Sequence, residues 1–281
     1  MKKRPFGATG VEVPVIGQGT WRIEETERSS AVASLRQGLD LGLSHIDTAE
    51  MYGSGAAEAI VGEAIAGRRD EVFLVSKVLP TNASRAGARK ACERSLRALR
   101  TDRLDCYLLH WRGSHPLAET ITAFEDLKAE GKILSWGVSN FDVDDMEEAF
   151  AVAGPNVIAC NQVLYHLGER AIEHAVTPWC EAHNVAVVAY SPFGQDAFPA
   201  PQSPGGQVLA SIAEAHGVTP RQVALAFLTR DAPLLAIPKA SRQGHVLDNA
   251  AAGDLELTPD EISRLDRSFA RGSRPRHLPM L

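Results

Sequence analysis

The sequence predicts an α/β fold, a closed barrel of eight parallel strands surrounded by helices, and two patterns support this prediction. Short apolar runs typical of buried parallel strands recur along the chain, and segments with helical periodicity lie between them. Because parallel strands need helical crossovers, eight such repeats favour a (β/α)8 TIM barrel. A doubly wound open sheet is the alternative, but Gly17–Arg22 lacks the third glycine of the dinucleotide fingerprint.

The expected strands and helices alternate along most of the chain. The strands are Val15–Gly19, Leu43–Asp47, Val72–Lys77, Leu104–His110, Ile133–Ser139, Val157–Gln162, Val185–Tyr190 and Leu234–Lys239. The helical patterns include Ala31–Leu41, Ala56–Ala66, Ser84–Leu99, Ala118–Glu130, Ile172–His183, Gln207–His216 and Arg221–Thr229. The last two patterns both fall between the seventh and eighth strands.

Capping residues indicate where several helices begin and end. Ser30 precedes the first helix, and Thr219 and Thr258 are each followed by a proline, which is favoured at the first helical position. The Thr258 pattern predicts a final helix after the eighth strand. Gly131 and Gly217 are expected to end helices.

The segment before the first barrel strand predicts a β-hairpin. Lys2–Pro14 has a turn signal at Thr9 and Gly10, and the hairpin is expected to close the bottom of the barrel. No linker or composition break divides the chain, so we expect residues 1–281 to form a single domain. Barrels of this type reach such a length as one domain.

Composition excludes several classes of protein. A net charge of -6 argues against nucleic-acid binding, which usually needs a basic face. No apolar run approaches the roughly 20 residues of a membrane helix, and no apolar signal segment follows the basic start. The four cysteines show no metal-ligand spacing, so no metal is expected. We therefore expect a cytoplasmic protein without a nucleic-acid or membrane partner, and a monomer, since a closed barrel has no free edge strand.

Polar and aromatic residues end the expected strands, where a barrel of this type builds its active site. Asp47 and Lys77 each close a run that should be buried, where an isolated charge costs several kcal/mol unless it is paired. We expect the two to pair with each other. Such a pair can be purely structural, but Tyr52 follows Asp47 closely enough for its hydroxyl to return over the same mouth.

These residues suit proton donation. A phenol with a pKa of about 10 is a weak acid, and we expect a neighbouring ammonium to lower that pKa. Tyr52, Lys77 and Asp47 would then form a proton-donating relay. His110, at the end of the fourth strand, is expected to orient a substrate carbonyl or to take part in the proton transfer.

Seven segments resemble the signatures of the aldo-keto reductase family, in the family's order. They are 45–53, 75–78, 108–110, 137–141, 161–162, 190–192 and 237–239. The sequence is most similar to short bacterial members of the methylglyoxal reductase type. The resemblance implies a catalytic tetrad of Asp47, Tyr52, Lys77 and His110, and the NADPH-dependent reduction of small aldehydes, ketones or dicarbonyls by direct hydride transfer, with Tyr52 as general acid.

The resemblance also implies how an extended NADPH binds without a Rossmann fold. Ser139, Asn140 and Gln162 would hold the nicotinamide carboxamide, and Tyr190 would stack on the ring. The implied cofactor-binding residues are Gly19, Thr20, Trp21, Asp47, Ser139, Asn140, Gln162, Tyr190, Ser191, Pro192, Phe193, Gly194, Lys239, Ala240, Ser241, Arg242, His245, Asp248 and Asn249.

Two positions depart from the family's pattern at the adenosine end. Lys239 and Arg242 match residues that clamp the 2′-phosphate, but Ala240 stands where many members have serine and His245 where many have a second arginine. Arginine is permanently charged, whereas histidine is mostly neutral at pH 7. We therefore expect NADPH to be preferred and some NADH to be used.

Trp21, Tyr52, His110 and Trp111 are expected to contact the substrate, a small carbonyl compound, in an open mouth. The basic tail 271–277 is expected to be a solvated end, and the alternative is that it leans over the site. Two alternatives stay open. A Schiff-base lyase would use Lys77 as its nucleophile, and a cofactor-sensing subunit, like the potassium-channel β subunits of the family, would keep the site but act through a partner.

Overall fold

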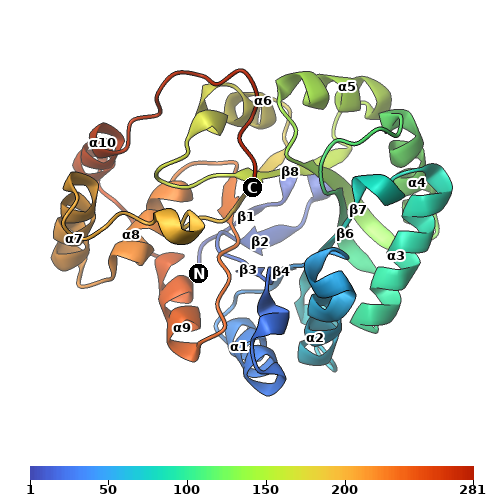
Figure 1. Ribbon diagram of the computed structural model, residues 1–281, viewed down its shortest axis with the longest axis horizontal. Coiled ribbons are helices and arrows are strands. Elements are labelled where there is room, and N and C mark those ends of the chain that lie inside the picture. Colours follow the sequence, from blue (N-terminus) through green and yellow to red (C-terminus); the bar gives the residue numbers. More distant parts are fainter.

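The computed structural model describes residues 1–281 and shows a ring of parallel strands surrounded by helices (Figure 1). The strands are β3 (Gln18–Gly19), β4 (His45–Asp47), β5 (Phe73–Val78), β6 (Leu104–Leu109), β7 (Ile133–Ser139), β8 (Ile158–Leu164), β9 (Ala186–Tyr190) and β10 (Leu234–Ala236). They lie in chain order and pair in parallel throughout. The amide of Gly17 donates to the carbonyl of Ala236 at 2.8 Å, and the amide of Ala236 donates to the carbonyl of Val15 at 2.9 Å. These bonds join the last strand to the first, so the predicted (β/α)8 barrel is confirmed.

Helices cover the outside of the ring. They are α1 (Arg28–Asp40), α2 (Ala56–Ala64), α3 (Arg85–Leu99), α4 (Leu117–Ala129), α5 (Val143–Ala153), α6 (Val176–Ala182), α7 (Pro204–His216), α8 (Pro220–Leu228), α9 (Gln243–Ala252) and α10 (Pro259–Ser268). None of them is long and apolar enough to cross a membrane.

Most of the expected helix ends are found, with one correction. Thr219 and Thr258 each form a capping box at the start of α8 and α10, with proline in the first turn. Gly217 ends α7 in the left-handed region. The prediction that Ser30 caps the first helix was wrong, because the Glu27 carboxylate accepts the amides of Ser29 and Ser30 and α1 begins earlier.

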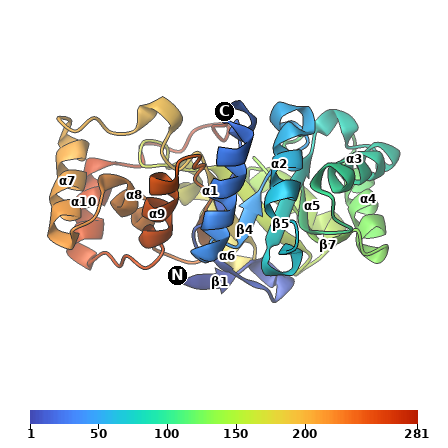
Figure 2. The same ribbon diagram turned by 90° about the horizontal axis from the view of Figure 1, so that it is seen from below.

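The N-terminal hairpin lies at the end of the barrel opposite the C-terminus (Figure 2). Strand β1 (Lys3–Pro5) pairs antiparallel with β2 (Glu12–Pro14), and Gly10 makes the turn with a φ of 76°. The fully buried Phe6 packs against His45 and Phe73, with ring centroids 5.5 Å and 4.5 Å away. Because these two residues begin β4 and β5, the hairpin closes the barrel bottom as expected.

His45 predicts a dependence of stability on acid. Both of its ring nitrogens are buried without hydrogen-bond partners, and burial lowers its pKa to about 3. An unfolded histidine titrates at about 6.5, so below that pH the unfolded chain binds more protons and the free energy of unfolding falls by about 1.4 kcal/mol per pH unit. Urea unfolding of wild type and His45→Phe between about pH 7 and pH 4.5 measures this effect. The variant should lose stability less steeply, and identical slopes would contradict the prediction.

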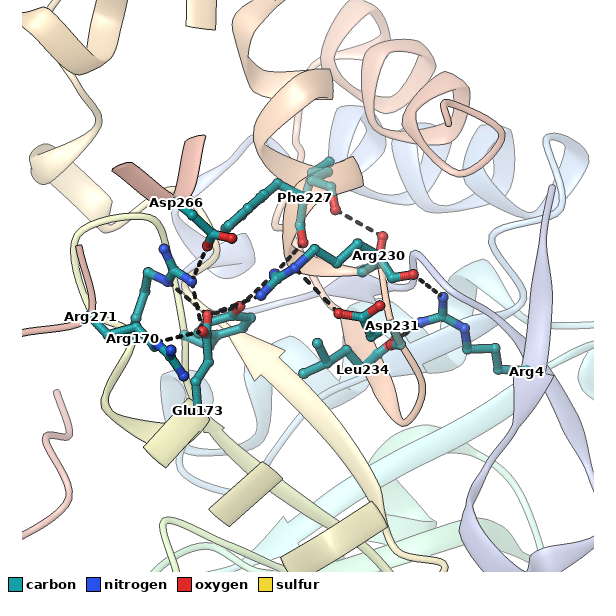
Figure 3. Close-up of polar contacts among 12 residues, drawn as sticks. Arg4, Arg170, Glu173, Phe227, Arg230, Asp231, Leu234, Asp266 and Arg271 are labelled. Carbon is teal, nitrogen blue, oxygen red and sulfur yellow. Dashed lines mark hydrogen bonds and ion pairs between the residues drawn. The ribbon is translucent and has the colours of Figure 1, made fainter. Parts of the chain in front are cut away.

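Arginines and carboxylates tie the start of the C-terminal segment to the barrel wall (Figure 3). Arg170, which follows β8, donates to the carbonyl of Phe269 at 2.5 Å and to Asp266 at 2.6 Å. Arg170 also donates to Glu173 at 2.7 Å, and the carboxylate of Glu173 lies 3.8 Å from Arg271. The root of the segment after α10 is therefore fixed.

The opposite side of Figure 3 shows how the hairpin is held. The guanidinium of Arg4, in β1, donates to the carbonyl of Asp231 at 2.7 Å and to that of Leu234 at 2.6 Å. Leu234 begins β10. The hairpin is thus bonded to the last barrel strand, at the end far from the site described next.

Candidate active site

Four ionisable side chains meet at the carboxyl ends of β4, β5 and β6. Asp47 is the last residue of β4, Lys77 lies near the end of β5, and His110 directly follows β6. Tyr52 begins the 3₁₀ turn that follows β4. Because neighbouring parallel strands end side by side, the barrel brings these residues together as the sequence predicts.

The ammonium of Lys77 is the centre of this cluster. Its Nζ donates to Asp47 Oδ1 at 2.5 Å, to the carbonyl of Thr48 at 2.9 Å and to Tyr52 Oη at 3.2 Å. All three ammonium donors therefore have partners. Burial by itself lowers the pKa of Lys77, but Asp47 and Tyr52 together raise it above its usual value. The lysine is thus held in its charged form.

Asp47 is fixed on both of its oxygens. Gln162 Nε2 donates to Oδ2 at 2.7 Å, while Lys77 occupies Oδ1. Burial raises the pKa of Asp47, and Lys77 and Gln162 oppose this shift. The bond from Gln162, at the far side of the barrel mouth in β8, is not predicted by the sequence pattern.

The pKa of Tyr52 differs from the expectation. Burial raises it above its ordinary value, and Lys77 offsets only part of that rise. The ammonium does lower the pKa of Tyr52 as expected, but the net shift is upward because desolvation of the phenolate outweighs the nearby charge. Tyr52 holds its proton at neutral pH, with the ammonium placed to stabilise the phenolate that loss of the proton would leave.

His110 stands beside the tyrosine as a neutral imidazole. The ring centroids of His110 and Tyr52 lie 5.9 Å apart at 75°. Burial and the charge of Lys77 lower the pKa of His110 to about 2, and its Nδ1 is buried without a partner. A histidine that stays neutral suits the orientation of a carbonyl by an N–H bond better than delivery of a proton from imidazolium.

Asp47, Tyr52 and His110 line a cavity of about 450 Å³ at the barrel mouth, whereas Lys77 does not line it. The expected site residues in its wall are Gly19, Thr20, Trp21, Asp47, Tyr52, His110, Trp111, Ser139, Asn140, Gln162, Tyr190, Ser191, Pro192 and Lys239. Met51, Gln195, Ile237, Met280 and Leu281 line it as well and were not expected.

Hydrogen bonds fix Ser139, Asn140 and Tyr190 in the wall of this cavity. Asn140 has a positive φ of 61° and donates to the carbonyl of His110 at 3.1 Å, while it accepts from Tyr190 Oη at 2.9 Å. Ser139 Oγ donates to the carbonyl of Gln162 at 2.8 Å. Asparagine tolerates the left-handed backbone that this arrangement requires. Bonds among the ends of β7, β8 and β9 therefore hold these side chains in place.

A second hollow of about 600 Å³ continues from the first. The two share Trp21, Ser191, Pro192, Gln195 and Lys239, so they form one cleft. The second is further lined by Arg22, Glu25, Phe193, Asp196, Arg221, Gln222, His245, Asp248 and Asn249. Of the expected cofactor residues, Gly194, Ala240, Ser241 and Arg242 line neither hollow.

The basic tail 271–277 is mostly exposed, as expected, and the segment that follows it takes the alternative course over the site. It returns over the middle of the barrel, where Figure 1 shows the C-terminus. Met280 and Leu281 line the first hollow, and the amide of Leu281 donates to Tyr190 Oη at 3.3 Å. Arg274 lies 3.7 Å from Asp142 on the way. The tip of the tail thus forms one wall of the mouth.

Comparison with known proteins agrees with this geometry. The model of the aldo/keto reductase family matches residues 15–269. The chain belongs to the aldo/keto reductase family.

Relatives of this aldo/keto reductase cover nearly its whole length. Methylglyoxal reductase YeaE of Escherichia coli (strain K12) is 49% identical over 92% of each chain. Glyoxal reductase of Bacillus subtilis (strain 168) is 31% identical over 92% of this chain and 89% of its own. The crystal structure of an aldo/keto reductase from Klebsiella pneumoniae in complex with NADP and acetate is 47% identical, covers 100% of both chains and has a TM-score of 0.94.

Proposed function

We propose that this aldo/keto reductase reduces small aldehydes, ketones or dicarbonyls such as methylglyoxal to alcohols with NADPH. The observation that carries the proposal is the position of a protonated tyrosine, bonded to a charged lysine, in the wall of a cavity that continues into a longer cleft. The names of the two curated relatives, a methylglyoxal reductase and a glyoxal reductase, support this substrate class.

The donor set of the cleft fits a dinucleotide phosphate. Amide and hydroxyl groups of Asn140, Ser139 and Gln162 line the catalytic end, which suits a carboxamide. Cationic side chains line the other end, among them Lys239 and Arg221, which suits phosphate. When bound, NADPH supplies a hydride, with its electron pair, to the carbonyl carbon of the substrate.

The chain's own residues supply the proton and the orientation. Tyr52 Oη gives its proton to the carbonyl oxygen, so that the hydride and this proton together complete the alcohol. Lys77 stabilises the phenolate left on Tyr52, and Asp47 holds Lys77 in place. His110 donates a hydrogen bond to the same oxygen as negative charge develops on it. Water then returns a proton to Tyr52.

The walls of the cavity favour small substrates. Trp21 and Trp111 provide an aromatic lining, and Met280 and Leu281 narrow the mouth. The cavity of about 450 Å³ must hold the nicotinamide as well, so the space that remains suits compounds of a few carbon atoms or one aromatic ring. We therefore propose that Trp21, Tyr52, His110 and Trp111 contact the substrate.

Consumption of reduced nicotinamide across a panel of carbonyl compounds tests the function. Methylglyoxal, glyoxal and benzaldehyde are each assayed with NADPH and with NADH, with glycerol as a compound without a carbonyl. Turnover of at least one dicarbonyl with NADPH, and slower turnover with NADH, is expected. Binding of NADPH without turnover of any carbonyl would favour a cofactor-sensing subunit instead.

The structure weighs against a Schiff-base lyase. Lys77 is 0% exposed, and its three donors are all engaged. A buried ammonium with a raised pKa is a poor nucleophile. Borohydride with substrate, in the absence of nicotinamide, is therefore expected to leave the mass of the protein unchanged.

We also propose that the enzyme is a monomer in the cytoplasm and forms a single domain. The barrel's closing hydrogen bonds leave no edge strand free to pair with another chain. Light scattering measures the molar mass in solution and so tests whether the enzyme is a monomer.

Glu50 is expected to position Tyr52. It lies in the short segment between Asp47 and Tyr52, and its Oε1 accepts from the amide of Leu79 at 2.8 Å and from Asn82 at 2.9 Å. Loss of the carboxylate charge weakens both bonds and lets the segment shift. Because small displacements at a reacting centre are costly, we expect Glu50→Gln to lower kcat about tenfold with little change in NADPH affinity.

The control for Glu50→Gln is Glu63→Gln, which breaks an exposed pair with Arg28. Exposed pairs contribute little to stability, so this variant should behave as wild type. Glu50→Asp, which keeps the charge, should recover part of kcat. An unchanged kcat in Glu50→Gln, or equal losses in the Gln and Asp variants, would speak against a positioning role.

A further inference from the structure

Basic side chains gather at the outer end of the cleft, but not all of them are free to bind an anion. The lining includes Arg22, Arg221, Lys239 and His245. Arg22 is already paired with Glu25 at 2.7 Å. His245 has an imidazole and not the planar guanidinium fork that matches phosphate.

Arg221 differs from the other basic residues of this hollow. Its guanidinium lies over the rings of Phe193 and Phe198, 5.5 Å and 4.8 Å from their centroids, and makes no hydrogen bond or ion pair within the protein. It is a permanently charged group without a counter-ion, in a chain whose net charge is -6. Its five N–H donors are available to a ligand in the cleft.

Two fixed elements hold Arg221 in this position. It lies in the first turn of α8, whose start is fixed by the capping box of Thr219 and Gln222. Phe193 and Phe198 contact each other edge to face at 5.9 Å and belong to the segment after β9. The rings restrict the otherwise flexible side chain, so less conformational entropy is lost when it binds an anion.

The position of Arg221 along the cleft indicates which anion it meets. Ser191 and Pro192 line both hollows and so mark their junction, whereas Arg221 lines only the outer one, with His245 and Asn249. The resemblance places the adenosine 2′-phosphate and the adenine at that outer end. Arg221 is therefore on the adenosine side of the junction.

We propose that Arg221 binds the 2′-phosphate of NADPH and supplies the guanidinium that is missing at position 245. The proposal rests on the proposed function, because it requires that the cleft bind NADPH. In this chain the guanidinium that lines the phosphate end of the cleft beside Lys239 then comes from the start of α8 and not from His245 of α9. Arg221 becomes a residue that determines the preference for NADPH over NADH.

Direct binding measurements test the proposal without relying on turnover. Trp21 lines both hollows, so quenching of tryptophan fluorescence reports dinucleotide binding. Arg221→Gln is expected to weaken NADPH binding at least about tenfold, as expected for loss of a charge-assisted hydrogen bond, and to leave NADH binding unchanged. The NADPH affinity of Arg221→Lys, which keeps the charge but not the planar fork, should lie between those of wild type and Arg221→Gln.

The matched control is Arg97→Gln, which removes the same charge from the exposed end of α3. It should leave both affinities unchanged. Adenosine 2′-phosphate and adenosine serve as competitors, and Arg221→Gln should weaken only the former. The midpoint of thermal unfolding of each variant shows whether α8 is intact.

The possible outcomes separate this proposal from the proposed function. If wild type binds NADPH and Arg221→Gln binds it equally well, the role of Arg221 is wrong and the function stands. If Arg221→Gln loses NADPH and NADH affinity to the same extent, Arg221 only holds the segment with Phe193 and Phe198, and the proposal is also overturned. If wild type binds neither dinucleotide, both proposals fail.

Discussion

Replacing Tyr52 with phenylalanine is expected to lower the rate of carbonyl reduction by about 10²–10⁴-fold, the range that general acids contribute. The change removes the only hydroxyl that the structure places beside both Lys77 and the cavity, at 3.2 Å from Lys77 Nζ. The ring, which contacts His110 edge to face, is retained. The loss should therefore fall on kcat, and NADPH affinity measured by fluorescence should stay near that of wild type.

Tyr107→Phe provides a matched control for this change. Tyr107 lies in β6, is fully buried, and its hydroxyl has no hydrogen-bond partner. Removal of an unpartnered buried hydroxyl is expected to be neutral or slightly stabilising, with no effect on turnover. A Tyr52→Phe variant that kept most of its rate would remove Tyr52 from the role of proton donor and leave His110 as the next candidate.

The barrel and its catalytic cluster could be predicted because their determinants are local in the sequence. Each strand is a short apolar run, and Asp47, Lys77 and His110 each stand at the end of such a run. Parallel strands in a closed barrel end at the same mouth, so residues at strand ends meet whatever the intervening helices contain. The closure between Val15 and Ala236 follows from the number of repeats.

Features that depend on tertiary contacts could not be predicted in this way. The return of Met280 and Leu281 to the mouth depends on the anchor at Arg170, far away in the sequence. The pKa of Tyr52 depends on how deeply the loop buries it, which spacing along the chain does not reveal.

Asp47→Asn is expected to have the second largest effect, on both stability and activity. The substitution keeps the shape of the side chain but removes the negative charge that lies 2.5 Å from Lys77 Nζ, in a place where both groups are at most 1% exposed. A buried charge that loses its partner destabilises a protein by about 3–5 kcal/mol. The side-chain amide introduced at position 47 also faces the amide of Gln162, which in the wild type donates a hydrogen bond to Asp47. We therefore expect a large loss in the free energy of unfolding at pH 7 and little remaining turnover.

Glu58→Gln is the control for a buried carboxylate without a lysine partner. Glu58 accepts from Ser76 at 2.6 Å on the outer side of the barrel, and burial raises its pKa. Its replacement leaves no unpaired buried cation. It should therefore destabilise the protein less than Asp47→Asn does and should keep turnover close to that of wild type.

The dependence on pH separates loss of the ion pair from a simple packing defect. In wild type the pKa of Lys77 is raised, so the stability that the pair contributes is present below the lysine's unfolded pKa and is lost only as the pH rises through the folded value. Without Asp47, burial dominates and lowers the pKa of Lys77 below its unfolded value. The variant then gains stability as the pH rises and the lysine loses its proton. Urea unfolding between about pH 7 and pH 10 should show the difference between wild type and Asp47→Asn becoming smaller, whereas a packing defect would keep it constant.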